Sequence, residues 1–131
     1  MRYILDTTVL IDHALDRYGA SELIERLLGD TGDIYLCDIV VAEALAKGSD
    51  DEIRTVERLV DAFEYVETTP NAARWAGASR RRLGRLSHRR LADSIVAAVA
   101  WDFDATVVTR NPRDFASQGV QVLAYGQPPA P

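Results

Sequence analysis

The sequence predicts an α/β fold of three layers, in which helices cover both faces of a mostly parallel central sheet. Short runs rich in β-branched and aromatic residues alternate along the chain with longer segments of helical apolar spacing. This alternation is typical of parallel strands joined by helical crossovers. No internal repeat and no linker divides the chain. The sequence therefore predicts one domain of this class.

The expected strands are short and apolar. The first begins almost at the N-terminus and ends in a carboxylate, Asp6. The last two lie in the final third of the chain. We expect strands at residues 2–6, Ile34–Cys37, Phe63–Val66, Ala105–Thr109 and Val120–Leu123.

The expected helices begin and end at residues with clear start or stop signals. Asp38 is placed to N-cap one helix, and Gly48 ends it. The last helix is apolar nearly all round, so we expect it to be buried. We expect helices at Thr7 to about Asp16, Ala20–Leu28, Ile39–Ala46, about Asp50 to Ala62, Pro70 to about Leu83, and Leu91–Asp102.

Composition describes an ordinary soluble domain of 131 residues, 47% apolar and 27% charged. We expect the domain to span residues 1–126 and residues 127–131 to form a flexible tail. Cys37 is the only cysteine, which excludes an internal disulfide. The chain opens on a strand-like run without a signal-peptide pattern, and no apolar run is long enough to span a membrane. We therefore expect a cytoplasmic protein.

Three of the most apolar stretches each carry one carboxylate, namely Asp6, Glu43 and Asp93. An ionised carboxylate taken out of water without a partner costs on the order of several kcal/mol. No basic residue lies within these stretches. A divalent cation shared by the three would remove the conflict, because hard cations such as Mg²⁺ bind carboxylate oxygens and water. The pattern therefore predicts an acidic, metal-binding pocket.

The predicted fold brings further polar residues to the same place. Open parallel sheets carry their sites outside the carboxyl ends of the strands, and Asp6 falls at such an end. Thr109, Asn111 and Asp114 follow a later strand in the same sense, so we expect them at the same edge. Asp93 lies in the first turn of its helix, where the helix dipole favours a carboxylate.

Each acid also has an ordinary alternative explanation. Asp6 or Asp93 could act only as an N-cap, and Glu43 could face solvent on an amphipathic helix. Asp114 follows Asn-Pro-Arg, where an aspartate is often turn chemistry. The order and spacing of the whole set favour a site over these separate explanations.

The positive charge is concentrated although the net charge is −5. Lys47 is the only lysine, so nearly all cations are guanidinium groups, which bind phosphate in a bidentate way. Two interpretations stay open: a solvated helix face paired with acidic neighbours, or a phosphate-contacting rim beside the acidic pocket. The concentrated cations are Arg80, Arg81, Arg82, Arg85, Arg89 and Arg90.

Four ordered motifs resemble those of the PIN-domain ribonucleases, and among these the VapC toxins of type II VapBC toxin–antitoxin pairs. They are ILDTTVLID at residues 4–12, AEA at 42–44, LADSIVAAVA at 91–100 and VTRNPRDF at 108–115. The chain departs from the family pattern at Thr8, where asparagine or serine is commoner, and at Ser87-His88, where glycine is expected. Neither departure changes a carboxylate.

The resemblance implies a PIN domain that cleaves RNA endonucleolytically with Mg²⁺, or Mn²⁺ in its place. It implies that Asp6 and Asp93 are the principal metal ligands and that Glu43 and Asp114 complete the set. Glu43 is the better candidate to orient the attacking water as a base. Hydrolysis of a phosphodiester fits these residue types, because a metal can activate water and neutralise charge at phosphorus.

Three polar residues are expected to support this set. Thr7, Thr109 and Asn111 could hold the ligands or the substrate phosphate by hydrogen bonds. The resemblance leaves open whether Asn111 or Asp114 is the fourth site residue. It also leaves open whether one or two ions bind.

The family resemblance further implies a homodimer and a cognate VapB-type antitoxin whose tail covers the acidic cleft. An arginine or lysine of that tail would meet the carboxylates. Two alternatives remain: a structure-specific DNA nuclease of the same fold, and a degenerate PIN fold that acts only as a binding partner. The presence of Asp6, Glu43 and Asp93 counts against the second alternative.

Overall fold

The core of the protein is a parallel sheet. The computed structural model describes residues 1–30, 32–84 and 91–128, and within these residues five strands form a sheet in the order β3-β2-β1-β4-β5. All neighbouring strands are parallel, which confirms the predicted α/β class. The strands are β1 (Arg2–Leu5), β2 (Asp33–Cys37), β3 (Glu64–Val66), β4 (Thr106–Thr109) and β5 (Val122–Ala124).

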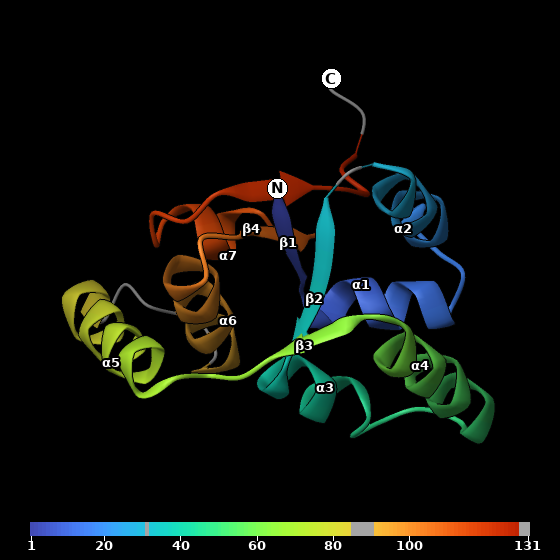
Figure 1. Cartoon of the computed structure of the whole chain (residues 1–131), viewed down its shortest axis with the longest axis horizontal. Helices are drawn as coiled ribbons and strands as arrows, with labels where there is room; N and C mark the ends of the chain where they lie inside the picture. Colours follow the sequence, from blue (N-terminus) through green and yellow to red (C-terminus); the bar gives the residue numbers. More distant parts are fainter. Residues whose placement is uncertain (31, 85–90, 129–131) are drawn as a thin grey trace.

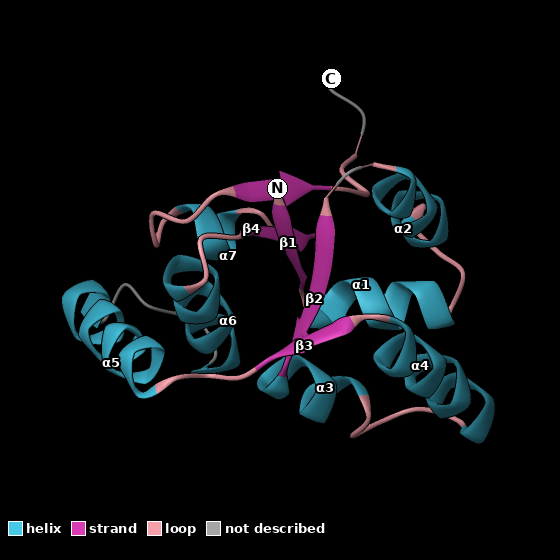
Figure 2. Cartoon of the chain, viewed as in Figure 1, coloured by secondary structure: helices cyan, strands magenta, loops and turns pink. Residues whose placement is uncertain are grey.

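Helices cover both sides of the sheet, which completes the three layers. Figure 1 shows α1, α2 and α4 on one side and α5, α6 and α7 on the other, and Figure 2 shows the strands between them. The helix α3 follows directly from β2 and packs against both α1 and α6. The helices are α1 (Thr7–Ala14), α2 (Ala20–Gly29), α3 (Asp38–Ala44), α4 (Asp50–Ala62), α5 (Pro70–Leu83), α6 (Leu91–Asp102) and α7 (Arg113–Ala116).

Two predicted helices have different limits in the structure. The first ends at Ala14 and not near Asp16, because Asp16 adopts a left-handed conformation with φ of 49° that stops a helix. The helix expected at Ile39–Ala46 is α3, which begins at Asp38 and ends two residues earlier than predicted, at Ala44. The Asp38 carboxylate still accepts a hydrogen bond from the Ile39 amide at 3.0 Å, although Asp38 is the first helical residue and not the N-cap.

The strand limits also shift by one or two residues. The last strand begins at Val122, two residues later than expected, and the other four are close to their predicted ranges. The short helix α7 was not predicted, because one turn of helix shows no apolar periodicity.

The helix α6 is buried along most of its length, as expected. Its Trp101 is 47% exposed and stacks on Trp75 of α5 at 5.5 Å between ring centroids.

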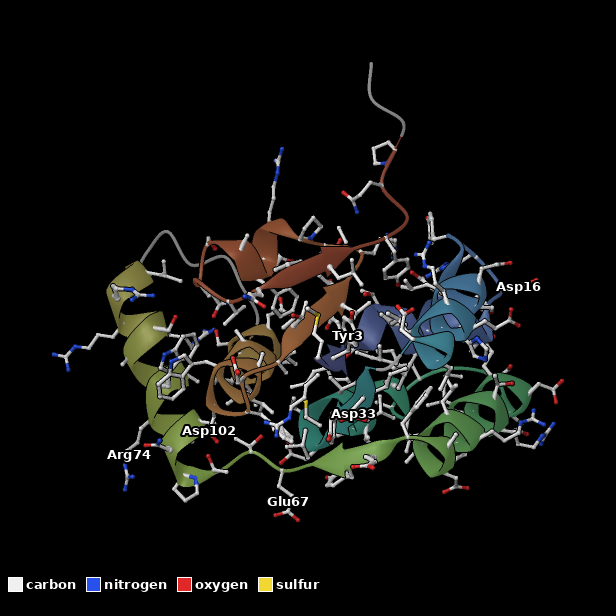
Figure 3. The ribbon with its side chains drawn as sticks, turned by 45° about the horizontal axis from the view of Figure 1, so that its top comes forward. Tyr3, Asp16, Asp33, Glu67, Arg74 and Asp102 are labelled. Atoms are coloured by element: carbon white, nitrogen blue, oxygen red, sulfur yellow. The ribbon has the colours of Figure 1, made fainter. Side chains whose placement is uncertain are left out.

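The order of the strands determines where a site can form. From β1 the chain builds β2 and β3 outward on one side, whereas β4 and β5 lie on the other side. The ends of β1 and β4 are therefore neighbours at the point where the strand order reverses, which is where open sheets bind ligands. Leu5 and Val108 are paired across these strands and are fully buried. In Figure 3, Tyr3 of β1 lies near the middle of the molecule, whereas Arg74 extends outward from α5.

Some predictions fall outside the described residues. These are the roles of residues 85–90, which include the Ser87-His88 departure and half of the arginine cluster, and the last three residues of the expected tail. Gln127 donates hydrogen bonds to the carbonyl oxygens of Arg110 and Tyr125, both at 2.9 Å. The domain limit at residue 126 stays a prediction.

In the part of the chain described, no helix has the length and apolarity needed to cross a membrane.

Candidate active site in an acidic pocket

A pocket of about 310 Å³ opens at the carboxyl ends of β1 and β4. Its walls come from α1, α3, α6, the loop that follows β4 and the short helix α7. The four acids predicted from the sequence all line it, although they come from distant parts of the chain. The lining residues are Asp6, Thr7, Thr8, Ile11, Glu43, Asp93, Asn111 and Asp114.

Asp6 is the most deeply placed acid of the pocket, with only 4% of its surface exposed. It follows β1 and N-caps α1, and its Oδ1 accepts a hydrogen bond from the Thr7 amide at 2.8 Å. Its Oδ2 accepts hydrogen bonds from the hydroxyls of Thr109 at 2.9 Å and Thr8 at 3.1 Å. Its amide donates to the carbonyl of Val108 at 2.9 Å, which ties this position to β4. The N-cap and the pocket acid are thus the same residue.

The surroundings of Asp6 disfavour its negative charge. Burial raises the pKa of Asp6, and the nearby charge of Glu43 raises it further, whereas the hydrogen bonds from Thr109, Thr7 and Thr8 lower it in part. The net effect is a raised pKa. No ion pair reaches Asp6 from any residue that the structure describes. A cation in the pocket would relieve this cost directly.

Glu43 enters the pocket from the middle of α3. The hydroxyl of Thr7 donates a 2.8 Å hydrogen bond to Glu43 Oε1, so α1 orients this carboxylate. Glu43 is half-buried. The alternative in which it only faces solvent on an amphipathic helix required a more exposed position. The contact thus joins an expected site acid to one of the residues expected to support it by hydrogen bonds.

Asp93 lies in the first turn of α6, as predicted, and its side chain is half-buried. The next residue, Ser94, is almost fully buried and accepts a 3.3 Å hydrogen bond from Arg80 of α5. This bond joins the last turn of α5 to the turn that carries Asp93. Arg80 of the arginine cluster is therefore hydrogen-bonded to the helix that carries Asp93.

Asn111 and Asp114 come from the loop and the short helix after β4. The Asn111 amide donates to Thr109 Oγ1 at 3.0 Å, and the Asp114 amide donates to the Asn111 carbonyl at 3.2 Å. Gln118 donates from Nε2 to the Asp114 carbonyl at 2.7 Å and so holds this turn from behind. Asn111 is exposed at the rim, whereas Asp114 is half-buried.

The structure separates the three residues expected to make supporting hydrogen bonds. Thr7 and Asn111 line the pocket, so they can meet a ligand. Thr109 is fully buried and donates to Asp6 from behind, so it holds an acid and does not face the pocket.

The chemistry of the pocket fits a hard divalent cation, although its geometry is not that of a finished ligand shell. All four acids offer carboxylate oxygens, which Mg²⁺ and Mn²⁺ prefer, and Asp6 is buried without a cationic partner among the described residues. Within residues 1–30, 32–84 and 91–128, no three acidic, histidine or cysteine side chains are arranged closely enough to hold a metal ion together. The carboxylates would have to converge to share one.

Sequence reasoning missed two features of the site. Thr8 lines the pocket and donates to Asp6, but it was noticed only as a departure from the family pattern. Arg110 lies between Thr109 and Asn111, and its side chain turns away from the pocket to pair with Asp12. The signal for Thr8 was its place two residues after an N-cap, where a hydroxyl can return to the capping carboxylate. The signal for Asp12 was an acid amid the apolar positions of α1.

Comparison with known proteins agrees with the family resemblance. The model of the PIN domain family matches residues 3–119. Ribonuclease VapC19 of Mycobacterium tuberculosis is 32% identical over 114 residues, which cover 86% of this chain and 90% of that protein. Among solved structures, FitAcB of Neisseria gonorrhoeae matches with a TM-score of 0.72 and 26% identity, over 92% of this chain and 96% of that one.

A further structural neighbour shares the fold at low sequence identity. It is VapBC2 from Rickettsia felis, bound to a DNA fragment from the promoter, with a TM-score of 0.81 and 18% identity. The match covers 95% of this chain and 99% of that one. The family match spans β1 to α7, so it includes every residue of the acidic pocket. The chain therefore belongs to the PIN domain family, and within that family to the VapC group.

Proposed function

We propose that this protein is a metal-dependent endoribonuclease and the toxin of a VapBC toxin–antitoxin pair. One observation carries the proposal: four acids of a PIN domain line one pocket at the switch point of the sheet, and the innermost acid is buried with no ion pair to any described residue. The relative at 32% identity is a ribonuclease, which supports RNA as the substrate. We also propose that the protein acts in the cytoplasm, on cellular RNA.

Asp6 and Asp93 would be the principal ligands of the metal, and Glu43 and Asp114 would complete the set directly or through water. A bound Mg²⁺, or Mn²⁺ in its place, would supply the positive charge that stabilises the transition state at phosphorus and favours deprotonation of the attacking water. The buried position of Asp6 and the hydroxyl donors around it hold this ligand in one orientation.

Glu43 is the residue best placed to orient and deprotonate the attacking water. Thr7 holds Glu43 Oε1, which leaves Oε2 to contact a water in the pocket. The proton of the water would pass to Glu43 as the oxygen attacks phosphorus, the bond to the leaving oxygen of the RNA would break, and that oxygen would take up a proton from solvent water. Asn111, exposed at the rim, can donate from its side-chain amide to a phosphate oxygen of the substrate.

The test is cleavage of a mixed cellular RNA pool by purified protein in Mg²⁺, Mn²⁺ or EDTA. Asp93→Asn removes one site charge at nearly constant volume, and Asp61→Asn removes an equivalent charge from an exposed position on α4. We expect discrete products with the parent and with Asp61→Asn in either metal. We expect no products in EDTA or with Asp93→Asn. Normal cleavage by Asp93→Asn would contradict the site assignment.

Two other outcomes would replace the proposal. Cleavage of structured DNA and not of RNA would favour the DNA nuclease of the same fold. Absence of cleavage by a correctly folded parent that binds a partner protein would favour a binding role alone. Circular dichroism of each sample separates these outcomes from loss of folding.

We further propose a VapB-type antitoxin as partner, which the VapBC assemblies among the structural neighbours support. An apolar groove of about 210 Å³ between α1, α3 and α4 adjoins the acidic pocket through Ile11, which lines both. An antitoxin segment in this groove could pass a basic residue to the carboxylates. The other groove residues are Ala14, Ala44, Lys47, Gly48, Glu52 and Val56.

Ala14 tests this partner surface, because it lines the groove without lining the acidic pocket. We expect Ala14→Arg to cleave RNA as the parent does but to lose copurification with the coexpressed VapB-type antitoxin. Retained copurification would exclude the groove as the binding surface.

We also propose a homodimer, which sedimentation equilibrium would detect as twice the mass of one chain.

A further inference from the structure

A buried charge cluster lies behind the acidic pocket. The side chain of Asp12, in the middle of α1, is completely inaccessible to solvent. Its Oδ1 accepts a 2.8 Å hydrogen bond from Arg17 Nε, and its Oδ2 accepts one of 2.8 Å from Arg110 Nε. The hydroxyl of Tyr125 also donates to Oδ2, at 2.7 Å. None of these four residues lines the acidic pocket.

Arg110 connects this cluster to the site. It lies in the chain between Thr109, which holds Asp6, and Asn111, which lines the pocket. Its amide donates to Thr8 Oγ1 at 3.4 Å, and Thr8 in turn donates to Asp6. Within the described residues the Arg17 side chain has no comparable connection, because it contacts Asp12 and the ring of Tyr18. The two guanidinium groups thus share one carboxylate but only one of them adjoins the site.

The C-terminal segment holds Arg110 from the other side. Gln127 donates to the Arg110 carbonyl at 2.9 Å, and the Tyr125 hydroxyl shares the Asp12 oxygen with Arg110. Gly126, with φ of 63°, passes so close that a Cβ there would lie 3.2 Å from Arg110 Cδ and 3.0 Å from Tyr18 Cβ. The Arg110 guanidinium lies 4.2 Å from the centroid of the Tyr18 ring. The amide, carbonyl and side chain of Arg110 are therefore all fixed.

We propose that Arg110 is a positioning residue, clamped by Asp12, Tyr18 and residues 125–127, that holds the loop from Thr109 to Asp114 in place over the acidic pocket. The proposal deepens the proposed function and rests on it for the catalytic consequence. Its physical basis is that a loop fixed at one residue by a buried ion pair presents its neighbours in one geometry. Residues 125–127 then help to position the loop over the acidic pocket, because they hold Arg110.

The test compares Arg110→Met with Arg17→Met. Each variant removes one guanidinium from Asp12 at similar side-chain length, and each leaves Asp12 with the other guanidinium and with Tyr125. The first readout is amide hydrogen exchange at Asn111 and Asp114, measured relative to Val107 in the core of β4. We expect faster exchange at both amides in Arg110→Met and parent-like exchange in Arg17→Met.

The second readout is Mn²⁺ binding to the protein without RNA, which titration calorimetry measures. We expect Arg110→Met to weaken Mn²⁺ binding and kcat by about tenfold or more, with a smaller change in KM, and Arg17→Met to leave all three unchanged. Gln127→Ala, which removes only the hydrogen bonds of an exposed side chain, should raise exchange at Asn111 by a smaller amount. This variant keeps the test decisive if Arg110→Met does not fold.

The outcomes for the two proposals are distinct. Exchange that is unchanged in Arg110→Met and Gln127→Ala, or that rises equally in Arg17→Met, would overturn the positioning role whatever the RNA assay shows. Exchange that rises only where Arg110 is affected supports the positioning role, even if the parent fails to cleave RNA. That failure would overturn the proposed function instead.

Discussion

The hydroxyl of Thr109 donates a 2.9 Å hydrogen bond to Oδ2 of Asp6, a residue 103 positions away in the sequence. Thr109 ends β4 and Asp6 follows the adjacent parallel strand β1, at the point where the order of the sheet reverses. The bond joins the innermost acid of the pocket to the strand that leads to Asn111 and Asp114. The topology of the sheet therefore determines the geometry of the site.

Thr109→Val should weaken metal binding without unfolding the protein. The substitution keeps the shape of the side chain and removes the donor to Asp6, so this carboxylate loses part of its orientation. We expect Mn²⁺ affinity to fall by about tenfold. Titration calorimetry measures it.

Thr106→Val is the matched control for this effect. Thr106 lies at the opposite end of β4, and its buried hydroxyl donates to Gln121 at 3.2 Å. This variant should lose a comparable amount of stability but bind Mn²⁺ normally. Equal losses of Mn²⁺ affinity in both variants would mean that the Thr109 bond serves stability alone.

Asp6→Asn should stabilise the protein when no metal is present. Burial and the charge of Glu43 raise the pKa of Asp6, which means that the folded state disfavours its ionised form. A neutral amide removes this cost, and we expect a gain of about 1 kcal/mol in the free energy of unfolding in EDTA. Thermal unfolding in EDTA measures the gain.

The order should reverse when the cation is added. Saturating Mn²⁺ should raise the unfolding temperature of the parent above that of Asp6→Asn, because a ligand that binds only the folded state stabilises it. Asp61→Asn should behave as the parent does in both conditions. An unfolding temperature of the parent that does not change when Mn²⁺ is added would contradict a metal site at this pocket.

Glu43→Gln should lower kcat far more than it lowers Mn²⁺ affinity. The amide can still accept the hydrogen bond from Thr7, but it cannot take a proton from water. Loss of a general base costs about 10² to 10⁴ in rate. Single-turnover cleavage of RNA measures the change, and Glu57→Gln on the exposed face of α4 is the control. A loss of Mn²⁺ binding equal to the loss of rate would assign Glu43 as a ligand and not as a base.

The Asp12 cluster should make stability depend on pH in the acid range. Burial alone would raise the pKa of Asp12, but hydrogen bonds from Arg17, Tyr125 and Arg110 and the charge of Arg110 hold the pKa below its ordinary value. The unfolded chain therefore takes up this proton at higher pH than the folded protein does. The stabilisation from Asp12 is complete above the ordinary pKa of about 4 and is lost as the pH falls through the lowered native value.

Urea unfolding of the parent and Asp12→Asn at several pH values measures this contribution. At pH 7 we expect Asp12→Asn to lose about 3 kcal/mol, because it leaves two guanidinium groups without their carboxylate. The difference from the parent should shrink toward pH 2. Asp51→Asn breaks the exposed pair with Arg54 and should change stability little at any pH. A difference for Asp12→Asn that is constant across the pH range would show that charge plays no part.

Sequence reasoning found the acids because each lies in a context that disfavours a charge. Asp6, Glu43 and Asp93 interrupt apolar runs, and parallel strands bring their ends to one edge, so the pocket followed from the sequence. The Asp12 cluster did not. A single acid on a helix is usually solvated, and its partners Arg110 and Tyr125 are 98 and 113 residues away. No local sequence pattern predicts a contact between residues so far apart in the chain.

The limits of the elements show the same division between local and distant causes. The helix α4 was predicted well, because Ser49 caps it and its apolar positions repeat with helical spacing. The end of α1 was not, since it depends on the left-handed conformation of Asp16, which the residue type does not require. The helix α7 is too short for any periodicity to predict.

The most direct test of the account is a Mn²⁺ titration of the antitoxin-free parent in which bound ion and RNA cleavage are measured on the same samples. We expect cleavage to rise in step with occupancy of the pocket, and Asp6→Asn to shift both curves together to higher Mn²⁺. Cleavage that is complete in EDTA, or that does not follow occupancy, would contradict a metal-dependent ribonuclease at this pocket.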